Sequence, residues 1–292
     1  QPEQGRHDRE PRGRGRGARG RGHGRMVPAC RRPARGRRTS QGPAYTACMS
    51  RIWNVAHRGA SADRPENTVV AALLAVEQGA DVVEADVRLT ADGVAVCIHD
   101  ATLDRTTTGS GPVRAHTVDQ VRALDAGGGE RVPTVRELLE ATTAHVRVNL
   151  DVKEADAVGP ALELVRELDV LHCVTFISFL PEVWDFVAEE SPESPVVHLV
   201  DSAAALASLA MADVGSSLIA AGVGVPHPLV TRDLVERMHR MGAGVFAWTV
   251  DDQAEMRRLI DLGVNGVVTN RPAALSEVLG QLHMSHRPGP AR

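Results

Sequence analysis

Short apolar runs alternate with amphipathic segments from residue 52 almost to the end of the chain. Most of these runs are rich in Val, Ile and Leu, as is typical of parallel strands that are buried on both faces. We predict strands at residues 53–56, 82–87, 94–98, 146–152, 174–178, 196–200, 244–249 and 266–269.

Helical periodicity follows most of these strands. We predict helices at residues 68–78, 135–143, 158–168, 181–190, 203–212, 229–241, 253–262 and 273–282. Several of them end at a glycine with the next strand close behind, which is a common helix C-terminus. Eight strands with a helix after nearly every one predict an α/β fold, a closed (β/α)₈ barrel. A doubly wound open sheet is the alternative, but no GxGxxG turn follows the first strand and polar residues gather at many strand ends.

Two irregularities interrupt this repeat. The second and third predicted strands are joined only by the short turn at residues 90–93, which predicts a hairpin. Residues 101–133 are rich in Thr and Gly and form a small insertion after the third strand. We expect this insertion to form a lid over the top of the barrel.

The N-terminal segment differs in composition from the rest of the chain. Residues 1–40 contain 13 arginines and only three acidic residues. We therefore predict a disordered Arg/Gly-rich tail over residues 1–50, a barrel domain over 51–284 and a flexible C-terminus over 285–292. A tail of this kind can bind nucleic acid or anionic lipid. We favour the alternative that nucleic acid is not a partner, because no aromatic residue interrupts the Arg/Gly run, and that the natural protein starts at Met49, which lies just before the first apolar strand.

Cysteine spacing and hydropathy bear on the compartment. The four cysteines, at positions 30, 48, 97 and 173, show no CxxC spacing, so neither a structural zinc site nor a disulfide framework is indicated. We therefore expect a reduced, cytoplasmic protein. No signal-like apolar stretch is present, and no apolar run is long enough to span a bilayer, so neither secretion nor stable membrane insertion is predicted.

Carboxylates at predicted strand ends indicate a metal site. Glu84 and Asp86 lie two residues apart in one strand and so point to the same face. Two unpaired carboxylates inside a barrel would be too costly to bury without a cation. Asp151, on another strand, supplies a third oxygen ligand. This set suits Mg²⁺ or Ca²⁺ better than zinc. For the Glu84-x-Asp86 pair alone, a solvated pair or a salt bridge is the alternative.

Two cations and two histidines accompany these carboxylates. Lys153 is the only lysine among 33 basic residues and lies two positions after Asp151, where it could hold a phosphate oxygen; a chance survivor of the bias toward arginine is the alternative. His57 and His99 follow the strands on either side of Glu84-x-Asp86. We expect them to face each other across the metal as an acid and a base, although a lone histidine after a strand is usually only a hydrogen-bonded residue.

An ordered series of motifs over residues 52–275 resembles the glycerophosphodiester phosphodiesterase family. The motifs are His57-Arg58-Gly59, Pro65-Glu66-Asn67-Thr68, Gly79-Ala80-Asp81, Glu84-Ala85-Asp86-Val87, Thr90-x-Asp92-Gly93, His99-Asp100, Leu103-x-Arg105-Thr106-Thr107, Gly109-x-Gly111, Leu124-Asp125-Ala126-Gly127, Pro133-Thr134, Asn149-Leu150-Asp151-Val152-Lys153, Ser178-Phe179, Trp248-Thr249-Val250, Gly263-Val264-Asn265-Gly266 and Arg271-Pro272.

The resemblance implies a TIM barrel, one divalent metal ion (Mg²⁺ or Ca²⁺, with Mn²⁺ also suitable) and hydrolysis of small glycerophosphodiesters to sn-glycerol 3-phosphate and an alcohol. The metal ligands that it implies are Glu84, Asp86 and Asp151, the acid/base pair is His57 and His99, and the phosphate-binding cations are Arg58 and Lys153. Asp151 stands where the family often has Glu, and Asn265 and Asn270 stand where Asp is frequent.

Three more residues receive expectations. Glu66 and Asn67 order the loop after the first strand, with Asn67 as a helix N-cap. Glu66 and Trp248 belong to the substrate pocket, where Trp248 packs against the alcohol or glycerol group, with a core role as the alternative. Two other functions stay open. One is a lysophospholipase D-like or other phosphodiesterase reaction on a lipid; the other is a non-catalytic barrel with a nucleic-acid-binding tail. An idle barrel should have lost a histidine or a carboxylate, and none is missing.

Overall fold

The computed structural model of the chain describes residues 51–208 and 220–285. The predicted tail at 1–50, the end of the helix predicted at 203–212 and residues 286–292 lie outside the described residues.

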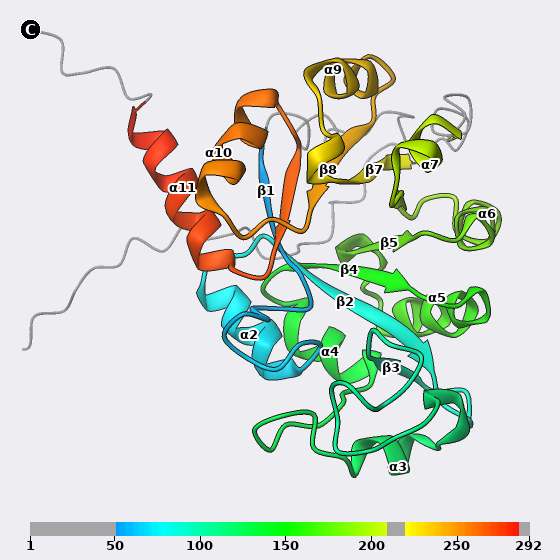
Figure 1. Cartoon of the computed structure of the whole chain (residues 1–292). Coiled ribbons are helices and arrows are strands. Elements are labelled where there is room, and N and C mark those ends of the chain that lie inside the picture. The colour runs from blue at the N-terminus through cyan, green and yellow to red at the C-terminus, as the bar shows by residue number, and fades with distance from the viewer. Residues whose placement is uncertain (1–50, 209–219, 286–292) are drawn as a thin grey trace, which may run out of the picture.

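Eight parallel strands close into a barrel (Figure 1). They are β1 (Trp53–Ala56), β2 (Val82–Leu89), β4 (Arg147–Val152), β5 (Val174–Ser178), β6 (Val196–Leu199), β7 (Ala220–Pro226), β8 (Gly244–Trp248) and β9 (Gly266–Thr269). The neighbour order is β1-β9-β8-β7-β6-β5-β4-β2, and pairing of β1 with β2 closes the ring. The predicted (β/α)₈ barrel is confirmed.

The membership of the barrel differs from the prediction at two strands. The third predicted strand, β3 (Ala95–Cys97), pairs antiparallel with β2 and lies outside the ring. Its place is taken by β7, which the sequence pattern missed because Gly222 and Pro226 interrupt the apolar run. Gly222 is required by the close approach of β8, since a Cβ atom there would lie 2.1 Å from the carbonyl oxygen of Gly244.

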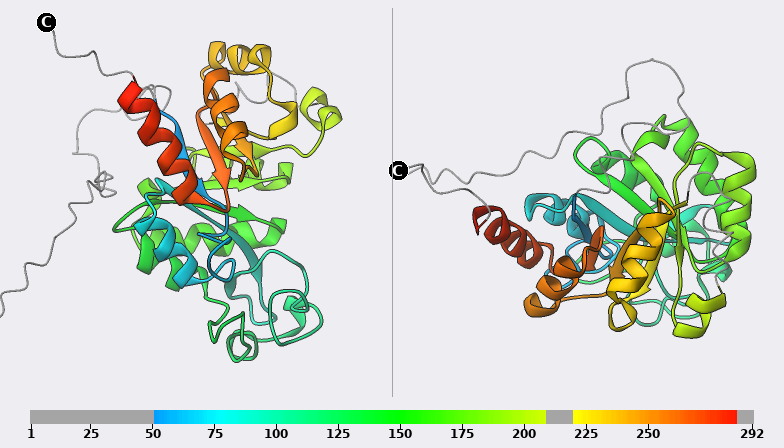
Figure 2. Two further views of the ribbon diagram at one scale, coloured as in Figure 1. Left: turned by 60° about the vertical axis from the view of Figure 1, so that its left-hand side comes forward. Right: turned by 90° about the horizontal axis from the view of Figure 1, so that it is seen from above.

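Helices cover the outside of the strands (Figures 1 and 2). They are α2 (Val69–Glu77), α4 (Val135–Thr142), α5 (Val158–Glu167), α6 (Pro181–Glu190), α7 (Ala203–Ser208), α9 (Arg232–Arg240), α10 (Gln253–Leu262) and α11 (Pro272–Ser285). Side chains such as Phe176, Leu150 and Leu139 are fully buried between the strands and the helices, and each contributes roughly 1.5–3 kcal/mol to the free energy of folding. In the part of the chain that the structure describes, no helix combines the length and hydrophobicity needed to cross a bilayer.

The insertion at residues 101–133 has a small hydrophobic core of its own. It contains the 3₁₀ turn η1 (Val113–Ala115) and the short helix α3 (Val118–Arg122), and buried side chains such as Leu103 and Val121 pack there against β3. In Figure 1 it lies next to β3, near the end of β2. None of its residues, all of which are described, lines the pocket at the barrel mouth. The expectation of a lid over the barrel is therefore wrong, because the insertion packs beside the mouth.

The cysteines also differ from the expectation. Cys97 on β3 is a free, buried thiol, whereas Cys173 is disulfide-bonded. The cysteine spacing indicated no disulfide framework and a reduced protein, and Cys173 departs from that expectation.

Candidate active site

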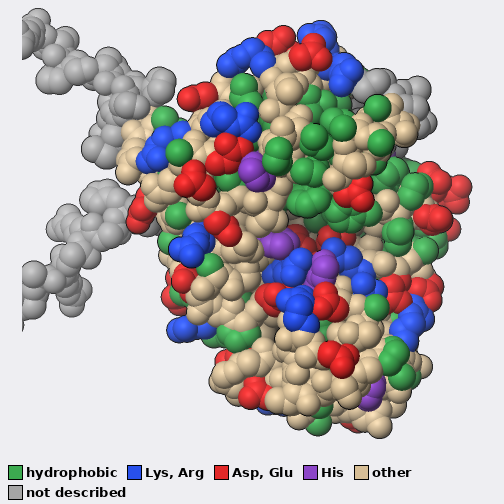
Figure 3. All heavy atoms as spheres, viewed as in Figure 1, with side chains coloured by type: hydrophobic (Ala, Val, Ile, Leu, Met, Phe, Trp, Pro, Cys, Tyr) green, Lys and Arg blue, Asp and Glu red, His purple; other side chains and the backbone are tan. Residues whose placement is uncertain are grey.

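A pocket of about 170 Å³ opens where the barrel strands end, the side on which (β/α)₈ enzymes carry their active sites. One part of its lining is charged or polar and the other is apolar. The polar residues are His57, Arg58, Glu84, His99, Asn149, Asp151, Lys153 and Thr249, and the apolar residues are Val55, Ile177, Phe179, Leu199, Trp248 and Val268. Figure 3 shows basic, acidic and histidine side chains gathered beneath a hydrophobic area on this face.

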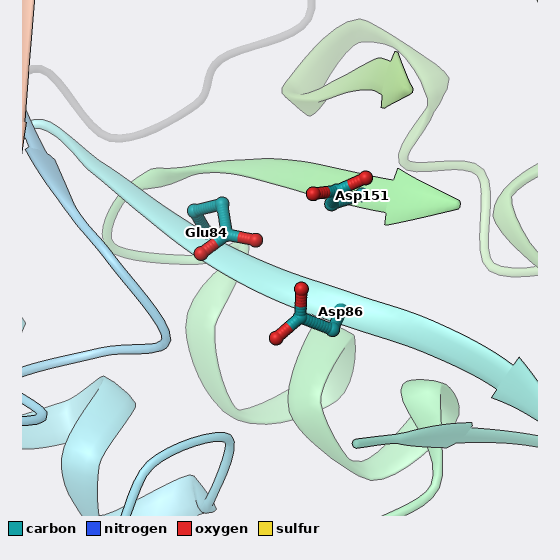
Figure 4. A group of neighbouring side chains, drawn as sticks. All are labelled: Glu84, Asp86 and Asp151. Carbon is teal, nitrogen blue, oxygen red and sulfur yellow. The ribbon is translucent and has the colours of Figure 1, made fainter. Parts of the chain in front are cut away.

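The three predicted metal ligands come together at the pocket, which Glu84 and Asp151 line (Figure 4). Glu84 and Asp86 lie two residues apart on β2, and the strand register places Asp151 of β4 directly opposite Asp86. One carboxylate oxygen from each residue lies within 4.8 Å of the other two. All three residues are at most 5% exposed, so their charges are shielded from water.

Hydrogen bonding and titration indicate that this triad suits a cation. Glu84 Oε1 and Asp151 Oδ1 are buried and have no hydrogen-bond donor among the residues that the structure describes. Burial, followed by the charges of Asp86 and Asp151, raises the pKa of Glu84 well above its usual value. Burial also raises the pKa of Asp151 to about 6, against the opposing effect of Lys153. Buried carboxylate oxygens without donors are costly unless a cation satisfies them, so these residues fit a divalent metal that prefers oxygen ligands.

The two predicted phosphate-binding cations lie against this triad. Lys153 Nζ is 2.9 Å from Asp86 Oδ1 and 2.5 Å from Asp151 Oδ2. Arg58 Nε is 3.1 Å from Asp86 Oδ2, and the Arg58 backbone N–H donates to Glu84 Oε2 at 2.8 Å. Burial opposes ionisation of Asp86, but the charges of Lys153 and Arg58 outweigh it and lower the pKa of Asp86. Two cations thus offset most of the charge of three carboxylates.

The backbone at Arg58 is unusual. Its φ of 56° lies in the left-handed region, which residues other than glycine adopt at a cost of about 1–3 kcal/mol. The hydrogen bond from its N–H to Glu84 is one interaction that holds this conformation. The strain therefore sits where the chain turns from β1 toward the carboxylates.

The first histidine is oriented by an amide. His57 Nδ1 lies 2.8 Å from Asn270 Oδ1, and Asn270 Nδ2 donates to Asp251 Oδ2 at 2.7 Å. Because this second bond directs the amide oxygen toward the ring, Nδ1 carries the proton and Nε2 is left as an acceptor. Burial first, and then the charge of Arg58, lower the pKa of His57. The contribution of Asp251 was not predicted from the sequence.

The second histidine is oriented by a carboxylate. His99 Nδ1 lies 2.7 Å from Asp100 Oδ1, and Asp100 Oδ2 accepts from Arg105 Nε at 2.6 Å. Arg105 first, and then His99, lower the pKa of Asp100. His57 and His99 line the same pocket, so the structure brings together the pair that the sequence singled out.

Asn67 has a different place from the one predicted. Thr68, not Asn67, is the N-cap of α2, because its side chain accepts from the backbone N–H of Ala71. The N-cap prediction is wrong. Asn67 Nδ2 instead donates to Asp86 Oδ2 at 2.7 Å, and Asn67 Oδ1 accepts from the Asp86 backbone N–H at 3.0 Å. Asn67 therefore orients a metal-ligand candidate. This contact with Asp86 was not predicted from the sequence.

Of the two predicted substrate-pocket residues, only Trp248 lines the pocket. Glu66 does not line the pocket; its Oε1 accepts from Arg58 Nη1 at 2.9 Å, so it holds a cation. Trp248 does line the pocket and packs edge-on against Phe179, with 5.7 Å between the ring centroids. Phe179 was not predicted as a pocket residue, although it follows directly on the end of β5.

Fold and pocket together define a (β/α)₈-barrel hydrolase of the phosphodiesterase class. The family model described as "Glycerophosphoryl diester phosphodiesterase family" matches residues 57–274. The chain belongs to this family, as the sequence motifs implied, and it is an enzyme that hydrolyses glycerophosphodiesters.

Individual relatives agree with this assignment. The chain is 34% identical to the glycerophosphodiester phosphodiesterase of Caldanaerobacter subterraneus subsp. tengcongensis, over 76% of this chain and 95% of that protein. It is 31% identical to the Bacillus subtilis glycerophosphodiester phosphodiesterase, over 78% and 86% respectively. Among solved structures, an Oleispira antarctica phosphodiesterase in complex with the product sn-glycerol-3-phosphate matches with a TM-score of 0.73 and 25% identity, over 81% of this chain and 99% of that chain.

Proposed function

We propose that this enzyme releases sn-glycerol 3-phosphate and an alcohol from glycerophosphodiesters, with one divalent metal ion held by Glu84, Asp86 and Asp151. The observation that carries the proposal is the pair of buried carboxylate oxygens without donors, on Glu84 and Asp151, in a pocket that also holds two cations and two histidines. When bound, the metal would polarise a phosphate oxygen. Mg²⁺ or Ca²⁺ suits three carboxylates best, and Mn²⁺ accepts the same ligands. The product bound to the Oleispira antarctica protein supports the proposed product.

Arg58 and Lys153 are the proposed phosphate-binding residues. Both residues line the polar part of the pocket, and both contact Asp86. A phosphate beside the triad would therefore meet a guanidinium and an ammonium. Fixed cations of this kind stabilise charge that develops on phosphate oxygens in the transition state.

The different partners of the two histidines suggest their roles. His57 keeps its proton on Nδ1, toward the neutral amide of Asn270, so Nε2 can accept the proton of the nucleophile. His99 is paired with the carboxylate of Asp100, which can balance the charge of a protonated ring, so this ring can give its proton to the leaving alkoxide. The nucleophile is either water or the substrate's own glycerol hydroxyl, which would form a cyclic phosphate that water opens later. In both cases His57 is the base and His99 the acid of the step that expels the alcohol, and opening of a cyclic phosphate by water would use the two rings in the reverse roles.

The apolar wall favours a second candidate substrate. Phe179 and Trp248 stand together with Ile177 and Leu199 on one side of the pocket, and Phe179 is 38% exposed. No acidic side chain belongs to this side of the lining. An alcohol with a hydrophobic portion could pack there, which supports a lysophospholipase D-like reaction as the second candidate.

We also propose a pathway and a compartment for the enzyme. Products of this chemistry would enter lipid and glycerol metabolism. We retain the cytoplasm as the proposed compartment on the spacing of the cysteines, and the disulfide at Cys173 is the observation against it. Subcellular fractionation of the native host, with thiol labelling before lysis, tests this point.

Product release tests the function. The full chain is incubated with glycerophosphocholine, glycerophosphoethanolamine or lysophosphatidylcholine, in the presence of Mg²⁺, Ca²⁺, Mn²⁺ or EDTA. Metal-dependent release of glycerol 3-phosphate from the first two substrates supports the proposal. Release of choline from lysophosphatidylcholine alone would favour the second candidate. No release from any of the three, by folded protein with every metal, would contradict both.

A further inference from the structure

Arg105, in the insertion, joins the partners of two active-site residues. Its Nε and Nη2 donate to Asp100 at 2.6 and 3.2 Å, and its Nη1 and Nη2 donate to Glu66 at 2.9 and 2.8 Å. Asp100 in turn accepts from His99, and Glu66 accepts from Arg58. One guanidinium thus links the ring that we assign as the acid to the cation that we assign to phosphate.

The loop that carries Arg105 is held in place by its neighbours. Leu103 is fully buried in the core of the insertion, and its backbone N–H donates to Gly111 at 2.9 Å. The hydroxyl of Thr107 donates to the Leu103 carbonyl at 2.7 Å, and Asp104 accepts from the Gly111 N–H at 3.1 Å. Arg105 therefore projects from a fixed backbone toward the barrel mouth.

The chemistry of this link requires arginine. A planar guanidinium can bond two carboxylates through separate N–H groups, whereas the ammonium of lysine is a single point charge. The side chain of Arg105 is 47% exposed, and exposed ion pairs contribute little to stability. Orientation of its partners, more than stabilisation of the fold, is what these contacts provide.

We propose that Arg105 is a positioning residue of the reaction. Through Asp100 it fixes the ring of His99, and through Glu66 it fixes the guanidinium of Arg58. The proposal rests on the proposed function, in which His99 protonates the leaving alkoxide. Arg105 does not line the pocket, so it acts through its partners and not on the substrate.

The two links predict different dependences on the leaving group. Departure of the choline alkoxide from glycerophosphocholine needs a proton, whereas p-nitrophenolate leaves from glycerol 3-(p-nitrophenyl phosphate) without one. Misplacement of His99 should therefore slow the choline ester far more than the nitrophenyl ester. Misplacement of Arg58 should slow both esters alike, because both carry the same phosphate.

The test measures kcat, KM and melting temperature for variants on both esters. We expect Arg105→Met to lower kcat on glycerophosphocholine by about 10- to 100-fold. The decrease in kcat on the nitrophenyl ester should be smaller by a factor of about ten or more. Asp100→Asn should show the same asymmetry, and Glu66→Gln should lose similar amounts on both esters. Arg105→Lys should recover only part of the rate. The matched control is Arg122→Met, which removes another arginine of the insertion that pairs with Glu137 and does not line the pocket; it should match the wild type on both esters.

Four outcomes would overturn the proposal. An unchanged kcat in Arg105→Met would remove the role, and an equal loss on both esters together with a lower melting temperature would make the residue structural. If Arg105→Met does not fold, Asp100→Asn decides, since symmetric loss there contradicts the link to His99. Absence of turnover by the wild type would instead overturn the proposed function, and this proposal with it.

Discussion

The two histidines of the pocket occupy contrasting surroundings. His57 follows β1, is partly buried, and bonds a neutral amide that belongs to the barrel itself. The side chain of His99 is 36% exposed, and it bonds a carboxylate that an arginine of the insertion holds. In the function that we propose, these different partners prepare the same residue type for opposite proton transfers. A residue of the barrel would then orient the base, and a residue of the insertion would orient the acid.

The largest expected effect comes from removing either ring. His57→Ala and His99→Ala should each lower kcat on glycerophosphocholine by about 10²- to 10⁴-fold with the fold intact. On the nitrophenyl ester, His99→Ala should recover most of its rate, because that leaving group needs no proton, whereas His57→Ala should stay slow. Steady-state kinetics on both esters measures the difference. Equal recovery in both variants would contradict the assignment of His57 as the base and His99 as the acid.

Removing a proposed metal ligand should impair the reaction on either ester. Glu84→Gln keeps the size of the side chain but removes a charge from a triad that is at most 5% exposed, so we expect metal affinity to fall and kcat to drop by about 10³-fold. Calorimetric titration with Mg²⁺ and Ca²⁺ reads binding without reference to turnover. Glu140→Gln, on the outer surface of α4, serves as the control. A variant that binds metal as tightly as the wild type would show that Glu84 is not a ligand.

The partner of His57 offers a smaller and more specific change. Burial and Arg58 lower the pKa of His57, so the base stays neutral at neutral pH, and the part of the acidic limb of kcat/KM that comes from His57 should lie below pH 6.5. Asn270→Asp places a carboxylate against the ring, favours its charged form and raises the pKa of His57. The acidic limb of the pH profile should therefore move to higher pH, and at neutral pH the rate should fall by about tenfold or less. An acidic limb that stays at the pH of the wild type would show that residue 270 does not affect the pKa of His57.

The barrel and the acidic triad could be predicted because both depend on short-range periodicity. A spacing of two residues puts Glu84 and Asp86 on one face of β2, and the register of parallel neighbours brings Asp151 beside them. Strand β7 was missed because glycine and proline obscure its pattern. The partners of the histidines could not be found in this way. Asn270 lies 213 residues from His57, and which atoms meet depends on closure of the barrel and on side-chain rotamers.

A third histidine provides the control for the comparison and the smallest expected effect. His227 Nδ1 lies 2.8 Å from Glu255 Oε1, so this ring also has a carboxylate partner, but it does not line the pocket. If a carboxylate partner alone made a histidine catalytic, His227→Ala would slow the enzyme. We expect kcat/KM to stay at the wild-type value and the free energy of unfolding to fall by no more than about 1 kcal/mol, since the pair is partly exposed. Kinetics and urea denaturation of the same preparation measure both quantities. A substantial loss of kcat/KM would mean that the site extends beyond the pocket, whereas an unchanged rate would show that a carboxylate partner alone does not make a histidine catalytic.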